Sequence, residues 1–213
     1  LISPVDEQAR VIGRGVARRW ILAARSKNVS VVYDESRTGF GRLGTMWGQE
    51  RTGLTADLTV LGGPAGGGWP LGVVIAPPEY FTVGADVSPQ AGHPVACCAG
   101  SVTLDVITLG VLEYMEDTAV LLEKGLDEVC AQFPQYLTGH HGAGLLRGLR
   151  FTTPAAADRF TLDCRGHGLY VAPPVGGTVI LAPVLITSTN EMTRGVDLIA
   201  STLLAWDDGD RPV

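Results

Sequence analysis

Apolar side chains recur at steps of three and four residues near the start of the chain, which is the spacing of one helix face. The stripe lies between residues 10 and 25 and consists of Ile12, Val16, Trp20 and Ala23. The next apolar run, residues 29–33, is rich in β-branched residues and ends at Asp34. A helix followed by a buried strand predicts an α/β layer, with the Asp34 carboxylate at the carboxyl end of the strand.

The same patterns predict further elements along the chain. Strands are expected at residues 58–61, 71–76, 145–151, 169–171 and 178–181. Helices are expected at residues 94–117, where Gly110 weakens the pattern, 122–133 and 155–164. A polar turn is expected over residues 139–144, and the capping-box spacing of Ser188 and Glu191 predicts the start of a last helix.

This order of elements divides the chain into two parts of different class. Strands and glycine-rich loops dominate the first part, and a long helix leads the second, which mixes helices and strands. We expect an α/β domain over residues 1–88 and a linking helix with a small α+β domain over residues 89–213. No internal repeat is visible.

Composition excludes several classes of protein. Of the 213 residues, 46% are hydrophobic and 18% are charged, which is too apolar for a disordered chain. The longest apolar runs fall short of a membrane span, so no membrane partner is expected. The net charge of −6 and the lack of a Lys/Arg cluster argue against a nucleic-acid partner. With no signal-peptide pattern, the cytoplasm is the expected location.

The cysteines and histidines predict no metal site. The four cysteines lack zinc spacing, and adjacent Cys97 and Cys98 lie in a stretch of small residues, which favours packed thiols in a reducing compartment. His140 and His141 lie in a glycine-flanked segment that we interpret as a surface turn.

One segment carries a specific resemblance. Residues 33–44, YDESRTGFGRLG, resemble the D-E-V-Q-T-G-F-G-R-T-G signature of the class III aminotransferases, the ornithine and acetylornithine aminotransferase family. Further stretches resemble family motifs in the same order, at residues 56–58, 66–72, 92–97, 146–149 and 182–187. The resemblance covers nearly the whole chain but only the C-terminal half of a family member.

The resemblance implies a fold and a cofactor. Family members are fold type I pyridoxal-phosphate enzymes with an α/β large domain, a small C-terminal domain and an active site at a dimer interface. Residues 1–88 would then be a remnant of the large domain, followed by the small α+β domain. Asp34 matches the family carboxylate that faces the pyridine nitrogen of the cofactor.

The resemblance also points to a missing lysine. The family holds the cofactor aldehyde as a Schiff base through the lysine of L-G-K-G, and Gly63 stands at that position. The chain has two lysines, Lys27 and Lys124, and neither matches a family position for this role. We therefore expect no covalently bound cofactor, and pyridoxal phosphate only with a partner subunit.

Two other family positions are changed. The threonine that reaches the phosphate across the dimer aligns with Pro89, and Ser88 is a shifted replacement for it. The glutamine near the ring hydroxyl is replaced by Arg37, a fixed cation. Arg37 either pairs with Asp34 or Glu35 or binds an anionic ligand.

Three functions remain open from the sequence. The preferred one is a degenerate aminotransferase-like subunit in a heteromer, whose partner completes the large domain or is a homologous catalytic subunit. The second is an enzyme independent of pyridoxal phosphate that uses Asp34 and Arg37 on an anionic small molecule. The third is a pseudoenzyme with a structural or regulatory role. Transamination by this chain alone is not expected, and the sequence does not define a substrate.

Overall fold

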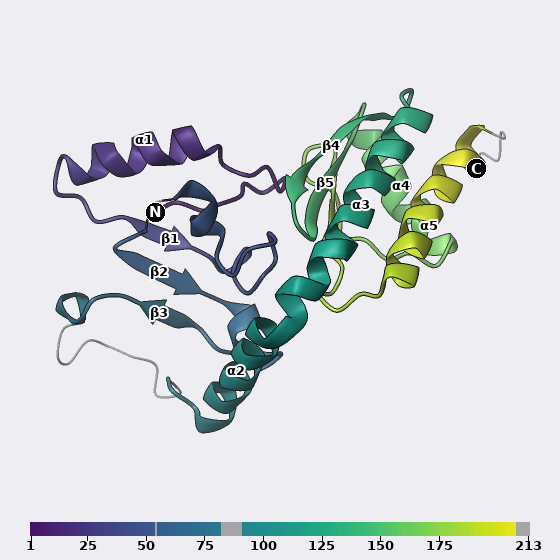
Figure 1. Ribbon diagram of the computed structural model, residues 1–213. Coiled ribbons are helices and arrows are strands. Elements are labelled where there is room, and N and C mark those ends of the chain that lie inside the picture. Colours follow the sequence, from purple (N-terminus) through teal and green to yellow (C-terminus); the bar gives the residue numbers. More distant parts are fainter. Residues whose placement is uncertain (54, 82–90, 208–213) are drawn as a thin grey trace. The chain divides into compact units, whose positions relative to one another are not determined.

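The computed structural model describes residues 1–53, 55–81 and 91–207, and these fall into two compact units (Figure 1). The first unit comprises Leu1–Val5 and Ile12–Leu112, and the second comprises Asp6–Val11 and Glu113–Val213. The boundary expected between residues 88 and 89 lies outside the described residues, within 82–90. The two compact units meet along the helical stretch that follows, between Leu112 and Glu113.

A three-stranded sheet forms the centre of the first unit. Its strands lie in the order β1 (Val32–Asp34), β2 (Leu58–Leu61) and β3 (Val73–Ile75). β1 and β2 run parallel, and β2 and β3 run antiparallel. Three short 3₁₀ turns connect the elements: η1 (Gly48–Thr52), η2 (Gly63–Gly66) and η3 (Pro78–Tyr80).

Helix α1 (Arg14–Arg25) forms where expected and covers β1 (Figure 1), but the expected stripe is wrong: the helix buries Ala17 and Ile21, whereas Trp20 is 56% exposed and Ala23 is exposed. Its buried Ile21 joins Ile2, Val31 and Tyr33 in one hydrophobic cluster. Ile2 also extends the sheet beyond β1, because its N–H donates to Val32 O at 2.7 Å and its carbonyl accepts from Asp34 N–H at 2.8 Å.

One long helical stretch follows the first sheet. α2 (Pro94–Val106) passes through a π-helical segment, η4 (Ile107–Val111), into α3 (Leu112–Gln132). Gly110 has a non-helical backbone, so the weak point expected there is a local distortion and not a helix end. The apolar runs in the sequence predicted no segment long enough to cross a membrane, but by length and composition the helical stretch Pro94–Gln132 is long and apolar enough to do so. Within the described residues it is the one helix that meets this criterion.

The second unit combines an antiparallel sheet with three helices. The strands lie in the order β4 (Leu137–Ala143), β5 (Leu146–Phe151) and β6 (Thr178–Leu181). α4 (Pro154–Gly166) and α5 (Thr189–Asp207) complete it together with α3, whose inner face buries Met115, Leu122, Leu126 and Val129. The capping box predicted for α5 is confirmed, since Ser188 N–H donates to Glu191 Oε2 and Glu191 N–H to Ser188 Oγ.

The segment Asp6–Val11 belongs to this second unit although it comes from the start of the chain. Gln8 O lies 2.7 Å from His141 Nε2 on β4. A Cβ placed on Gly148 of β5 would lie 2.5 Å from Gln8 O, so only glycine fits beneath the segment without a shift. We call Asp6–Val11 the N-terminal strap.

Several sequence predictions are wrong. The expected turn at 139–144 is mostly strand β4, which therefore carries His140 and His141, and residues 169–171 form no strand. His140 Nε2 lies 2.9 Å from Asp127 Oδ1, and its side chain is 9% exposed. Cys97 and Cys98 are exposed and not packed, because α2 turns Ala96 inward instead.

Candidate functional site

Two parallel strands end side by side at the candidate site. Asp34 closes β1 and pairs in register with Val60 of β2, so the residues that follow both strands meet at one edge of the sheet. Glu35 N–H continues the pairing by donating to Val60 O at 2.8 Å. Carboxyl ends of parallel strands are where α/β proteins place their ligands.

Asp34 forms the first corner of this site. Its carboxylate is half-buried, and Oδ1 accepts a hydrogen bond of 3.0 Å from Ser36 N–H, which closes the turn after the strand. Asp34 thus fills the turn-capping role that any strand-end aspartate can take. A half-buried carboxylate at this place can also accept a proton or face a cationic ring.

Glu35 fixes the loop that follows, a role that the sequence did not reveal. Its side chain is buried, and its carboxylate accepts hydrogen bonds from Gly48 N–H at 2.9 Å and Gln49 N–H at 2.6 Å, as well as from the Thr38 hydroxyl. The D-E pair of the motif marks Glu35 in the sequence, but the backbone donors that bind its carboxylate lie 13 and 14 residues downstream, at Gly48 and Gln49.

Arg37 lies on the same turn as Asp34, three residues further on, and its side chain is exposed. The structure therefore brings the two predicted site residues onto one loop. The Glu35 carboxylate, which the sequence offered as a partner for Arg37, is taken up by Thr38 and two backbone N–H groups. Ser88 and Pro89, expected near a phosphate, lie outside the described residues.

Gly62 and Gly63 form the opposite corner, directly after β2. A Cβ on Gly62 would lie 2.9 Å from Ser36 Cβ, so the two strand-end loops touch there and leave no room for a side chain. A Cβ on Gly63 would meet no atom within 4 Å. The site thus has open space where a side chain of residue 63 would begin.

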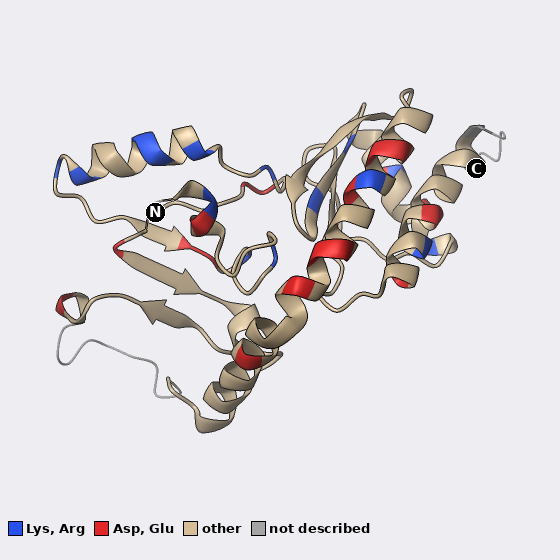
Figure 2. Ribbon diagram, in the orientation of Figure 1, with Lys and Arg blue, Asp and Glu red and all other residues tan. Residues whose placement is uncertain are grey.

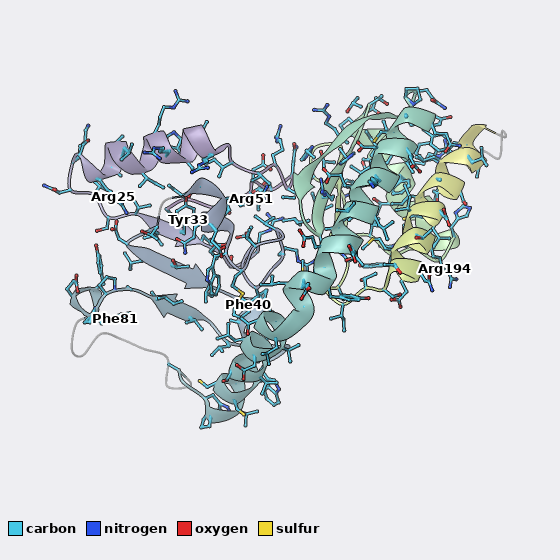
Figure 3. All side chains as sticks on the ribbon, in the orientation of Figure 1. Arg25, Tyr33, Phe40, Arg51, Phe81 and Arg194 are labelled. Carbon is cyan, nitrogen blue, oxygen red and sulfur yellow. The ribbon has the colours of Figure 1, made fainter. Side chains whose placement is uncertain are left out.

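Aromatic and buried side chains pack in and around the loop that follows Asp34. Phe40 and Trp47 stack edge to face with ring centroids 5.4 Å apart, and Tyr33 donates from its hydroxyl to Thr52 Oγ1 at 3.0 Å. Figure 3 labels Phe40 and Tyr33. Burial raises the pKa of Tyr33 and lowers the pKa of Arg42. Both groups therefore belong to the scaffold of the loop rather than to its exposed rim.

A covalent pyridoxal-phosphate site needs a lysine amine near Asp34. Lys27 follows α1 and precedes β1, at the opposite end of that strand from Asp34, and Lys124 belongs to α3 in the second unit. Among the described residues of the first unit, none therefore offers an amine to a cofactor at Asp34, although the Asp34 carboxylate itself fits a cationic ring nitrogen.

Solved structures with the same fold are pyridoxal-phosphate transaminases. The acetylornithine aminotransferase of Elizabethkingia anophelis superposes with a TM-score of 0.86 at 25% identity, over 95% of this chain and 53% of that one. The ornithine aminotransferase of Toxoplasma gondii ME49 superposes with a TM-score of 0.88, over 97% of this chain and 51% of that one, at 21% identity. The fold is thus an α/β fragment of the fold type I class.

The sequence profile of Aminotransferase class-III matches residues 19–203, and the chain belongs to this family. It is 28% identical to the acetylornithine aminotransferase of Agrobacterium fabrum, over 96% of this chain and 53% of that enzyme. It is 33% identical to the acetylornithine aminotransferase of Parasynechococcus marenigrum, over 83% of this chain and 43% of that enzyme. The chain spans about half the length of the curated relatives it matches.

Proposed function

We propose that this chain is a class III aminotransferase-like subunit that does not anchor pyridoxal phosphate itself. It works in a heteromeric assembly whose second polypeptide supplies the rest of the large domain, the anchoring lysine, or both. Gly63 carries this proposal, because it stands after β2 beside the Asp34 turn, where the family resemblance places the lysine.

The chemical argument concerns the amine. Transaminases use a lysine to hold the cofactor aldehyde and to move a proton at the substrate carbon. Glycine offers neither function, and Lys27, in the same unit, lies at the opposite end of β1 from Asp34. What this chain retains is the Asp34 carboxylate, held at the strand end by Ser36 N–H.

The argument for a partner rests on apolar surface. β3 lies at the edge of its sheet with Val74 and Ile75 about half exposed, and Trp69 and Phe81 are equally exposed before and after it. A flat, apolar edge strand invites pairing or aggregation unless another chain covers it. A second polypeptide that continues the sheet would remove this exposure.

Borohydride reduction tests the missing anchor. We expect the purified chain, mixed with pyridoxal phosphate and reduced with sodium borohydride, to yield no stoichiometric pyridoxyl-lysine peptide by mass spectrometry. Gly63→Lys is the matched control, because open space at residue 63 admits the side chain, and we expect it to yield the adduct at position 63. A stoichiometric adduct at Lys27 or Lys124 of the unaltered chain would refute the proposal.

The oligomeric state tests the partner. We expect the chain alone to self-associate or aggregate in size-exclusion chromatography with light scattering, because its apolar edge is uncovered. A stable folded monomer would count against the heteromer. The cofactor-independent enzyme built on Asp34 and Arg37, the pseudoenzyme role and the cytoplasmic location stay predictions.

A further inference from the structure

A polar cavity of about 470 Å³ lies within the second unit. Five of its lining side chains are titratable: Arg10 of the N-terminal strap, Glu123 of α3, His140 and His141 of β4, and Arg147 of β5. A concave site with several convergent polar groups is typical of ligand binding. None of these residues belongs to the loop at Asp34, so the cavity needs an explanation of its own.

His140 is the lining residue whose hydrogen bonding is incomplete. Its side chain is 9% exposed, and its Nε2 lies 2.9 Å from Asp127 Oδ1. The other ring nitrogen, Nδ1, is buried and finds no hydrogen-bond partner among the described residues. Because a buried polar atom without a partner is costly, native proteins leave few of them. Nδ1 is therefore available to a ligand atom.

The contact with Asp127 decides what kind of atom suits Nδ1. A carboxylate accepts hydrogen bonds, so Nε2 carries the hydrogen that is donated to Asp127. In the neutral ring, Nδ1 then offers only a lone pair. A protonated ring donates from both nitrogens, and with Asp127 on one side it can donate to a second anion on the other.

Two arginines add positive charge to the cavity. Arg147 is 6% exposed, and its Nη1 and Nη2 lie 3.1 and 3.0 Å from the Glu123 carboxylate, while Nε donates to Gly144 O. These contacts use three of its five N–H groups. Arg10 binds Asp6 through Nε, and its side chain stays exposed. Figure 2 shows acidic residues along α3, of which Glu123 lines the cavity, so two fixed cations face one carboxylate there.

A metal ion fits this lining less well than an anion does. Within the described residues, no group of three His, Cys, Asp or Glu side chains is placed to hold a metal. His141 is engaged by the strap, because its Nε2 lies 2.7 Å from Gln8 O. The guanidinium groups of Arg10 and Arg147 would also repel a cation.

We infer that this cavity binds a small molecule through an oxyanion group, a carboxylate, phosphate or sulfate, with His140, Arg147 and Arg10 as donors. The His140 ring takes up one proton from solvent as the anion binds. Nδ1–H then donates to an anion oxygen, and Nε2–H stays on Asp127. The inference goes beyond the proposed function, since it depends neither on a partner chain nor on Gly63.

The charges around the ring explain why the proton enters together with the anion. Asp127 and Glu123 of α3 favour a proton on His140, whereas Arg147 of β5 and Arg10 of the strap oppose it. His141, next on β4, is held by a carbonyl and adds no fixed charge. A bound anion adds negative charge to this set and thereby favours the protonated ring.

Titration calorimetry of the full chain at pH 7.5 tests the inference. Sulfate and succinate are the probes, because neither changes its own charge near this pH. Titrations in two buffers of different ionisation enthalpy give the number of protons taken up. We expect at least one probe to bind with uptake of about one proton, since free histidine is mostly neutral at this pH. Binding of sulfate alone assigns a tetrahedral anion, and binding of succinate alone assigns a carboxylate.

His140→Gln is the decisive variant. We expect it to weaken binding of the probe by roughly tenfold or more and to abolish proton uptake, because one charge-assisted hydrogen bond is lost and an amide takes up no proton. His167→Gln, at an exposed position after α4, is the matched control and should change neither quantity. Arg10→Gln, on an exposed side chain, should weaken binding severalfold and leave proton uptake intact.

The remaining outcomes overturn the inference. Absence of binding by both probes does so, and so does equal affinity with equal proton uptake in His140→Gln, which would leave the contact between His140 and Asp127 a purely structural pair. Circular dichroism shows whether His140→Gln folds; if it does not, unchanged affinity in Arg10→Gln overturns the inference. Self-association through β3 leaves the test valid, because the cavity belongs to the second unit and β3 to the first.

Discussion

At the scale of single residues, the candidate site contains two adjacent carboxylates that differ in burial and in hydrogen-bond partners. Asp34 stays half-buried at the strand end, while its neighbour Glu35 is buried and binds the loop between residues 36 and 49. The divergence follows from the strand, because successive side chains point to opposite faces. Asp34 therefore remains partly accessible at the strand end, whereas Glu35 maintains the loop geometry.

Replacing the buried carboxylate should unfold the loop more readily. We expect Glu35→Gln to lower the free energy of unfolding by about 2–3 kcal/mol, because an amide NH₂ would then face backbone N–H donors in a buried place. Urea denaturation followed by circular dichroism measures this. Glu50→Gln is the matched control, since Glu50 accepts a similar backbone bond, from Trp47 N–H, at an exposed position. An equal loss in both variants would contradict the role of Glu35.

Cysteine reactivity should follow burial. Burial raises the pKa of Cys130 to about 11, and burial also raises the pKa of Cys164, so few thiolates form there at neutral pH. Cys97 and Cys98 are exposed. We expect iodoacetamide at pH 8 to modify Cys97 and Cys98 at least tenfold faster than the other two, as measured by peptide mass spectrometry over time. Comparable rates at all four thiols would show that the second unit opens readily.

At the scale of elements, an ion pair joins α3 to the second sheet. Arg147 of β5 is 5% exposed and places Nη2 3.0 Å from Glu123 Oε2 of α3. The hydrogen bond from Arg147 holds the pKa of Glu123 below its ordinary value of 4.5. Because the pKa of the folded state is the lower one, the pair stabilises the fold above that ordinary value. The contribution disappears as the pH falls through the lowered pKa.

Removing this pair should therefore have a pH-dependent effect. We expect Glu123→Gln to cost about 1 kcal/mol of stability at pH 7, a modest figure because the glutamate is half exposed. The difference from the unaltered chain should shrink as the pH falls below 4.5 and through the lowered pKa, so it should be smaller at pH 3 than at pH 7. Urea denaturation at both pH values measures it, with Glu128→Gln on the same helix as the control. A difference that persists undiminished at pH 3 would point to lost packing and not to lost charge.

Local signals explain which elements the sequence could predict. The α5 cap and the strand Thr178–Leu181 appear where expected, because their signals lie within a few neighbouring residues. β4 was missed because its glycines and histidines have no strand preference of their own, and pairing with β5 imposes the extended form. The family motif placed Gly63 at the site, but the open space around it emerged only from the fold.

At the scale of the whole molecule, the chain passes between its two units at three points, after Val5, Val11 and Leu112. The N-terminal strap lies between the first two passages and packs on β4 and β5. The strap thus belongs to one unit while both of its ends continue into the other. The order of elements in the sequence could not reveal this arrangement, since it depends on contacts between distant residues.

Gly148 is the position where the strap can be displaced. We expect Gly148→Ala to push the strap outward, because the new Cβ would lie 2.5 Å from Gln8 O and 2.6 Å from His141 Nε2. Limited trypsin digestion should then cut after Arg10 several times faster than in the unaltered chain. Gly166→Ala, which meets no neighbouring atom, is the control. Unchanged cleavage in Gly148→Ala would show that the strap is not held there.

The bond between Gln8 and His141 spans 133 positions of the sequence. During synthesis the strap leaves the ribosome before β4 and β5, which form its binding surface. Closing so long a loop is entropically costly, and contacts between distant positions slow folding. The N-terminal strap therefore cannot dock until β4 and β5 have paired, although Ile2, a few residues before it, finds its partners on β1 much earlier in the chain.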